Sequence, residues 1–304
     1  FINSANFTFN SSRRALANAQ LCVELLIHHP QIDINLQTSK NETALTIACQ
    51  NHKYDLIKTL LQSPQIDPNV KGSYDNTALH IACQQGQADL VQMLLNNQKT
   101  QVNYSNINDE TPLSISCDRN RIDIVKLLLN REDLVVFTRS QYNPIRNAIQ
   151  KNNSELFSIL LHHPSFKVNQ LDANSVTPLG YSINSQNIDF IRQLLFVQDI
   201  DVNKKFCITK INNNSNRRFY NQQQQQQQLE FTTPLNYALK LDNYQIAKML
   251  IQSPDLNANE YIDGKTTLQS SIISNNHKIT SLLLSSSNID PNLITTFDPN
   301  SITL

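Results

Sequence analysis

Hydrophobic residues recur along the chain in pairs of blocks that are separated by polar stretches. The second block of each pair places apolar residues at i, i+1, i+3, i+4 and i+5, for example at Leu90, Val91, Met93, Leu94 and Leu95. These positions form a wide stripe on an α-helix, so each second block predicts a largely buried helix. The first block of each pair is shorter and predicts a shorter helix.

Each first block opens on a Thr-x-Leu start or a close variant. Successive starts lie 34, 34, 32, 34, 56 and 33 residues apart, so the longest interval holds one repeat and an insertion of about 22 residues. A threonine caps a helix N-terminus, and proline suits the first turn because its missing N–H would have no helical acceptor there. The starts are Thr43-Ala44-Leu45, Thr77-Ala78-Leu79, Thr111-Pro112-Leu113, Asn143-Pro144-Ile145, Thr177-Pro178-Leu179, Thr233-Pro234-Leu235 and Thr266-Thr267-Leu268.

A recurrent asparagine lies in the polar stretch after all but one of the second blocks. Asparagine tolerates left-handed backbone geometry and hydrogen-bonds its own main chain, so we expect it to form a tight turn. The pattern therefore predicts a repeating order of helix, helix and turn-rich hairpin. The asparagines are Asn35, Asn69, Asn103, Asn169, Asn203, Asn259 and Asn292.

This order resembles the ankyrin repeat. The segment Thr77-Ala78-Leu79-His80-Ile81-Ala82 matches the T-P-L-H-x-A signature, with alanine in place of proline. The resemblance covers nearly the whole chain and implies an all-α repeat solenoid of stacked helix-turn-helix ankyrin repeats joined by short hairpin loops. It also implies a glycine between the two helices, but only Gly86 fits. The other repeats carry His52, Asn120, Asn152, Gln186, Asp242 and Asn275 there.

The repeats divide the chain into three parts. We expect repeats one to six over residues 1–203 (the first one degenerate or truncated), an insertion over 204–232, and repeats seven and eight with the start of a possible ninth over 233–304. The chain starts without methionine and neither end looks capped, so we expect a segment of a longer protein. The insertion is rich in Asn and Gln and contains Gln222–Gln228, and this composition predicts disorder. Its five Lys and Arg residues leave open a contact with an acidic partner, although a solvated loop is the favoured interpretation.

One hairpin is irregular. The segment Arg131–Phe137 is two residues short and lacks the turn asparagine. Either the hairpin is remodelled locally, or Val135–Phe137 form an exposed apolar patch that a partner covers. We favour remodelling.

Composition excludes several classes of protein. The 25 Lys and Arg residues balance the 25 Asp and Glu residues, so there is no basic footprint for nucleic acid. No apolar run approaches the roughly 18–20 residues that span a bilayer. Five cysteines make no disulfide framework. We expect a monomeric, cytoplasmic protein, with a nuclear location not excluded.

Candidate chemistry is sparse. The pairs His28-His29 and His162-His163 follow second helices, where a polar side chain meets free carbonyls, and neither has a third metal ligand. Cys49, Cys83 and Cys117 repeat every 34 residues, which is typical of small buried residues in helix contacts. With four glycines there is no phosphate-binding loop. We therefore expect no enzyme, no cofactor and no metal.

The resemblance implies that a partner contacts the hairpin tips and the exposed ends of the first helices on a concave surface. The sequence therefore predicts a non-enzymatic scaffold that binds an unidentified protein partner. An alternative is a targeting or autoinhibitory segment of a larger enzyme or channel. Hot spots favour Tyr and Arg, which selects Tyr74, Arg119 and Tyr142. The full set of candidate residues is Lys40, Glu42, Tyr74, Asn76, Gln84, Gln85, Asn108, Glu110, Asp118, Arg119, Tyr142, Gln150 and Lys151.

Overall fold

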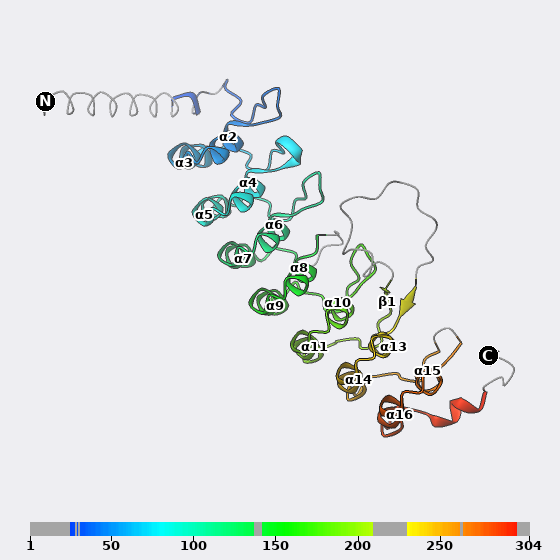
Figure 1. The fold of residues 1–304 in the computed structure, drawn as a ribbon. Coiled ribbons are helices and arrows are strands. Elements are labelled where there is room, and N and C mark those ends of the chain that lie inside the picture. Colours follow the sequence, from blue (N-terminus) through cyan, green and yellow to red (C-terminus); the bar gives the residue numbers. More distant parts are fainter. Residues whose placement is uncertain are drawn as a thin grey trace, which may run out of the picture. The chain divides into compact units, whose positions relative to one another are not determined.

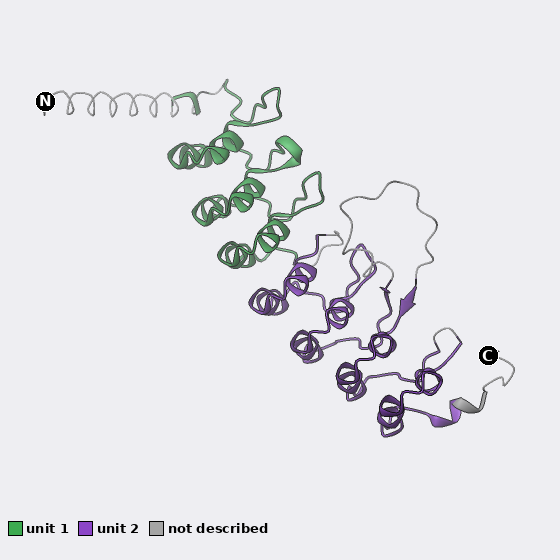
Figure 2. Cartoon of the chain, in the orientation of Figure 1, with its two compact units in different colours: residues 1–135 green, residues 136–304 purple. Residues whose placement is uncertain are grey.

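The computed structural model describes residues 25–27, 29, 31–136, 142–208, 230–261 and 264–296. The chain divides into two compact units, residues 1–135 and residues 136–304 (Figure 2). Within each unit, helix pairs stack in chain order (Figure 1). The elements of unit 1 are α2 (Ala44–Gln50), α3 (Tyr54–Gln62), the 3₁₀ turn η1 (Ser73–Asp75), α4 (Ala78–Gln85), α5 (Ala88–Leu95), α6 (Pro112–Asp118) and α7 (Ile122–Leu129).

Unit 2 continues the pattern and adds a short pair of strands. Its elements are α8 (Pro144–Gln150), α9 (Ser154–Leu161), α10 (Pro178–Asn184), α11 (Ile188–Leu195), β1 (Phe206–Cys207), β2 (Phe231–Thr232), α13 (Pro234–Lys240), α14 (Tyr244–Ile251), α15 (Thr267–Ile273), α16 (His277–Leu284) and the 3₁₀ turn η3 (Pro291–Thr296).

The first helices begin where the sequence predicts. The first residue of each of the seven starts is the N-cap. At α2, for example, the Thr43 hydroxyl accepts the backbone N–H of Thr46, and the Thr46 hydroxyl accepts the N–H of Thr43 at 2.8 Å. Proline occupies the first turn of four of these helices. The polar start thus satisfies helix N–H groups that have no acceptor within the helix.

The residue between the two helices of each repeat is the one at which the ankyrin pattern has a glycine, and it adopts the left-handed conformation that glycine favours. Gly86 has φ of 73°, and the six other residues at this position all have φ between 50° and 57°. In non-glycine residues this conformation is uncommon, and Asn and Asp adopt it most readily. The low glycine content of the chain is therefore met by polar residues that accept the same turn.

The core lies along the second helices. Ile57, Leu90, Ile124, Phe157 and Phe190 are fully buried. Phe157 and Phe190 stack with ring centroids 4.4 Å apart. The small residues of the first helices, which let the helix pairs approach, are buried as well: Ala48, Ala82, Ser116, Ala148, Ser182, Ala238 and Ser271.

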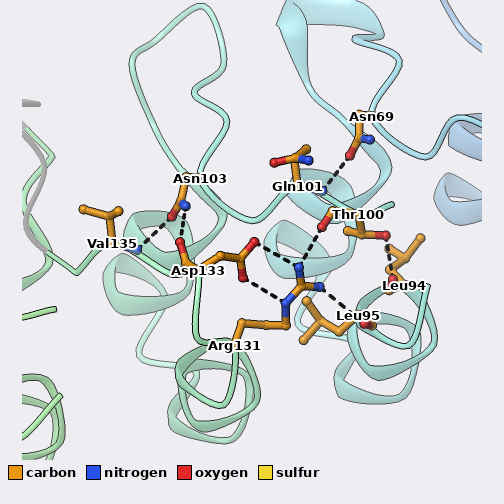
Figure 3. A network of polar contacts seen from close by, with 9 residues as sticks. All are labelled: Asn69, Leu94, Leu95, Thr100, Gln101, Asn103, Arg131, Asp133 and Val135. Atoms are coloured by element: carbon orange, nitrogen blue, oxygen red, sulfur yellow. Dashed lines mark hydrogen bonds and ion pairs between the residues drawn. The ribbon is translucent and has the colours of Figure 1, made fainter. Parts of the chain in front are cut away.

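The turn asparagines Asn35, Asn69, Asn169, Asn203 and Asn259 lie in turns, as predicted, but the expected left-handed geometry is wrong. None of the described ones has a positive φ. Instead, six of them join their hairpins to the next repeat, and we call these contacts the asparagine bridges (Figure 3). Asn69 accepts the Gln101 N–H at 2.7 Å. It also donates from Nδ2 to the Lys99 carbonyl at 2.8 Å. Asn35, Asn103, Asn169, Asn203 and Asn259 make the same pair of bonds to residues further along the chain.

The local turn is formed by the residue two positions earlier. The Asp67 carboxylate accepts the backbone N–H of Asn69 at 2.9 Å, and Asp33, Asp201 and Asp290 do the same for the asparagines that follow them. The aspartate fixes the turn and frees the asparagine side chain to reach the neighbouring repeat.

The irregular hairpin follows the regular pattern as far as it is described, so the expected remodelling is untested. The Val135 N–H donates to Asn103 as in the other asparagine bridges, and Val136 is buried like Val102 and Val202 at the same position of other repeats. Leu134 and Val136 are buried, while Val135 between them is exposed. The Val136 N–H donates to the Ser165 hydroxyl at 3.0 Å. Phe137, which the patch interpretation also invoked, lies outside the described residues. The same holds for His28 and for the start of a ninth repeat at Ser301–Leu304.

The flanks of the insertion form the paired strands, which the sequence did not predict. Phe206 pairs with Thr232 and Cys207 with Phe231 in an antiparallel register. Phe206 is fully buried, and its ring meets Tyr237 edge-on at 5.6 Å. It covers Gly180, where an added Cβ would lie 2.8 Å from the ring. Residues 209–229, including the glutamine tract, lie outside the described residues, so the expectation of disorder there is untested.

Candidate interaction surface

Four hairpins are described at their tips, and each is closed by one short backbone hydrogen bond. These bonds run from Thr38 to Glu42, Gly72 to Asn76, Asn106 to Glu110 and Asp172 to Val176, with lengths of 2.8–3.1 Å. The fourth residue of each tip has a positive φ: Asn41, Asp75, Asp109 and Ser175. The tips therefore share their closing bond and the conformation of their fourth residue, which places equivalent residues at equivalent points.

Neighbouring tips in unit 1 are also bonded to each other. The Ser73 hydroxyl donates to the Lys40 carbonyl at 2.7 Å, and the Ile107 N–H donates to the Tyr74 carbonyl at 3.0 Å. In addition, the Gln37 side chain donates to the Lys71 carbonyl at 2.8 Å. Since the tips are fixed before any partner arrives, binding there would cost little loop ordering.

The candidate residues of unit 1 fall into two groups. Those that are exposed are Lys40, Tyr74, Gln84, Asn108, Asp118 and Arg119. The others are half-buried and make contacts along the array. The Asn106 amide donates to both Asn76 and Glu110, and Gln85 donates to the Gln50 carbonyl. Glu42 is also half-buried. Asn76, Gln85 and Glu110 thus help to hold the surface together.

The candidates of unit 2, Tyr142, Gln150 and Lys151, are exposed. Behind them, Arg146 of α8 lies over the Tyr181 ring, with its guanidinium carbon 5.6 Å from the centroid. The Tyr181 hydroxyl donates to the buried Asp172 carboxylate at 2.6 Å. Burial, and then the negative charge of Asp172, raise the pKa of Tyr181, so the phenol stays protonated.

His80 is a buried structural residue. It lies three residues into α4, and its Nδ1 is 2.8 Å from the Thr77 hydroxyl. Its Nε2 is 3.1 Å from the Glu110 carbonyl, so it joins the first helix to the next hairpin. Burial lowers the pKa of His80 to about 4, which keeps the ring neutral. Thr46, Ser114 and Gln269 close the equivalent capping boxes.

The cysteines and histidines that the sequence offered as candidates for catalysis or metal binding have structural roles wherever the structure describes them. Burial raises the pKa of the Cys49 and Cys83 thiols to about 12, so neither is a nucleophile at neutral pH. His162 lies 2.6 Å from the Ser158 carbonyl at the end of α9. Within the described residues, no cluster of three or more His, Cys, Asp or Glu side chains could hold a metal ion. None of the described helices is long and apolar enough to cross a membrane.

A polar network closes the end of unit 1. Arg131 forms a two-pronged ion pair with Asp133, with both N–O distances at 3.0 Å, and it also donates to the carbonyls of Leu95 and Thr100 (Figure 3). The Asp133 carbonyl in turn accepts from Asn103 at 2.6 Å. All groups of this network are committed to the fold, so it is not a candidate binding site.

Helix pairs with left-handed connections, capping boxes and hairpin-to-hairpin bonds identify the fold. A family model for ankyrin repeats in three copies matches residues 13–106, 66–138, 90–169 and 208–295, which is more than half of the chain. The chain belongs to the ankyrin-repeat family. Ankyrin repeats are generally protein–protein interaction modules, and their domains are typically non-enzymatic.

Two solved structures are similar to this ankyrin-repeat chain. The ankyrin repeat domain of human ASB11 is 20% identical, with a TM-score of 0.49 over 85% of this chain and 99% of that one. The ankyrin repeat domain of Bcl-3, a unique member of the IkappaB protein family, is 14% identical, with a TM-score of 0.51 over 90% and 95%. The likeness to Bcl-3 shows a shared fold alone. No curated protein sequence matches the chain.

Sequence reasoning missed two exposed residues of the surface. Ile107 at a hairpin tip has 67% of its side chain exposed, and Tyr104 at the neck of the same hairpin has 43% exposed. The available signal was the comparison of repeats: Ile107 stands where the preceding hairpins have Ser39 and Ser73.

Proposed function

We propose that this ankyrin-repeat chain binds a protein partner through its hairpin tips and the exposed ends of its first helices. The observation that carries the proposal is the row of exposed side chains on tips that are bonded to one another, from Lys40 through Tyr74 to Asn108. Side chains on a fixed backbone lose little entropy on binding, and Tyr and Arg are the residue types that most often dominate binding energy.

A capture experiment tests this surface. The full chain is immobilised, and proteins retained from a cell lysate are compared with those retained by a Tyr74→Ala, Arg119→Ala, Tyr142→Ala variant. A matched control replaces three exposed residues of second helices: Lys58→Ala, Gln62→Ala and Gln92→Ala. Thermal unfolding followed by circular dichroism checks that all three proteins fold.

The proposal predicts that at least one protein is retained by the wild type and by the control but lost from the triple variant. Retention of every partner by the triple variant, or equal loss from both variants, would show that the surface is chosen wrongly.

A further inference from the structure

Tyr74 is unusual among the described hairpin tips. Its φ is 59° and its ψ is 26°, while Lys40, Asn108 and Asn174 at the same position of the other described tips have no positive φ. A bulky side chain is rarely found in this region, because the Cβ atom crowds the neighbouring carbonyl oxygen. Nevertheless, 73% of the Tyr74 side chain is exposed. The hairpin thus accepts a strained backbone at a residue whose ring packs against little else.

Two further apolar side chains are exposed on this hairpin and the next. Ile107 donates its N–H to the Tyr74 carbonyl, so the backbones that carry these two side chains are directly hydrogen-bonded to each other. Tyr104 lies below the tip, with the Lys71 ammonium 5.9 Å from its ring centroid. We call Tyr74, Tyr104 and Ile107 the tip patch. All three residues belong to unit 1.

The tip patch lies in acidic surroundings. Residues 71–76 and 104–110 carry Asp75, Asp109 and Glu110 against a single cation, Lys71, so the two hairpins have a formal charge of −2. The Lys71 ammonium lies 3.5 Å from the Asp75 carboxylate. The whole chain, in contrast, has a formal charge of zero. An apolar surface with a negative rim favours a partner with the complementary arrangement, because such fields steer association and reject like charges.

We infer that the tip patch docks a partner segment that carries a large apolar side chain flanked by Lys or Arg residues. The inference rests on the proposed function and adds to it the chemistry of the partner. The apolar side chain covers Tyr74 and Ile107, and the cations face Asp75, Asp109 and Glu110. Exclusion of water from the apolar contact strengthens these charge interactions.

The repeats themselves supply substitutions that keep the fold. Asn108 and Asn174 occupy the position of Tyr74 in other repeats, and Ser39 and Ser73 occupy that of Ile107. A Tyr74→Asn, Ile107→Ser variant therefore introduces only residues that other repeats of this chain have at the same positions. Asn41 occupies the position of Asp75 and Asp109, so Asp75→Asn, Asp109→Asn removes the net charge in the same way. Phe196→Ser is a matched control, because Phe196, the C-cap residue of α11 in unit 2, is 84% exposed.

The experiment uses the full chain and a displayed library of short random peptides. Selected peptides are synthesised with a fluorophore, and their affinities are measured by fluorescence anisotropy at low and at physiological ionic strength. Each peptide is also made with its Lys and Arg residues replaced by Glu. We expect the selected peptides to combine basic and large apolar residues. The Tyr74→Asn, Ile107→Ser variant should weaken their binding by about tenfold or more, while Phe196→Ser leaves it unchanged.

Two further readouts separate binding from folding and from charge. Tyr74→Asn relieves the strained backbone, so its melting temperature should equal or exceed that of the wild type even though binding is lost. The Asp75→Asn, Asp109→Asn variant should bind more weakly and with a smaller dependence on salt.

The inference is overturned if the library yields no binder, if the selected peptides are acidic or uncharged, or if the tip variant binds as well as the wild type. Peptides that are lost on Gln84→Ala, Asp118→Ala, Arg119→Ala but retained by the tip variant would leave the proposed function standing without the tip patch. If neither variant alters binding, both proposals fail.

Discussion

The side-chain amide of Asn69 holds two backbone groups of the following hairpin, and one of them is the N–H of Gln101 at 2.7 Å. The other is the Lys99 carbonyl, 2.8 Å from Nδ2. One planar amide thus acts as donor and acceptor at once, two residues apart on the same strand of backbone. This contact recurs at five other asparagines of the described chain.

Removal of this bridge should destabilise unit 1. Asn69→Ala loses both hydrogen bonds, and because the site is partly exposed we expect a loss of about 1–2 kcal/mol in the free energy of unfolding. Urea denaturation followed by circular dichroism measures this loss. Asn69→Asp keeps the acceptor but turns a carboxylate oxygen toward the Lys99 carbonyl, so it should be at least as damaging. An unchanged urea midpoint in both variants would contradict a bridging role.

Gly180 and Phe206 should depend on each other. Gly180→Ala places a methyl group against the Phe206 ring, and we expect a loss of about 1–3 kcal/mol from overpacking. Phe206→Ala alone should cost about 3–5 kcal/mol, because a fully buried aromatic ring is removed. In the double variant the added methyl group meets no ring, so its cost should largely disappear. Strictly additive costs in a thermal or urea double-mutant cycle would show that the two residues do not interact as described.

The buried His80 ring should make stability depend on pH. Burial lowers its pKa in the folded chain to about 4, below the ordinary value of 6.5, so the unfolded chain binds more protons between these values. The contribution of the neutral His80 ring to the free energy of unfolding is therefore fully present above pH 6.5 and is lost as the pH falls toward 4. A shift of this size corresponds to about 3 kcal/mol at most.

The control for this prediction is His80→Ser, since Ser114 closes the same capping box in α6. Unfolding free energies of the wild type and the variant, measured across this pH range, should converge at low pH. Parallel curves would mean that His80 does not titrate on unfolding.

Val135 and Val136 should differ strongly in their response to the same substitution. Val136→Ser introduces a hydroxyl at a fully buried position, and we expect a loss of about 2 kcal/mol or more. Val135 is exposed, so Val135→Ser should change stability by less than about 0.5 kcal/mol. Thermal unfolding compares the two variants directly. Equal effects would argue against the burial of Val136.

The parts of the fold that the sequence predicts are those decided by neighbouring residues. The cap at Thr43, the buried stripe of α5 and the left-handed turn at Asn275 each depend on a few positions in one segment. The asparagine bridges could not be predicted in this way, because the partners of Asn69 lie 30 and 32 residues further along the chain. Its repetition indicated a structural role, but its residue type favoured a local turn.

The sequence predicts where the candidate residues lie on the hairpins. It predicts much less well which apolar side chains are exposed there. Repeat spacing places Tyr74 and Asn108 at equivalent tip positions, as the hairpins confirm. The exposure of Ile107 and the strained backbone of Tyr74 depend on how two tips meet, and a single repeat does not encode that contact. In the same way, the burial of Phe206 depends on Gly180 in an earlier repeat.

The pairing of β1 with β2 brings both ends of residues 209–229 to one point on unit 2. The two ends of this stretch are therefore held together by the strand pairing, and for any loop between fixed ends each doubling of length costs only about 0.6 kcal/mol. A change in the number of residues between β1 and β2 should therefore alter the stability of unit 2 only slightly, as long as the strand pairing is kept.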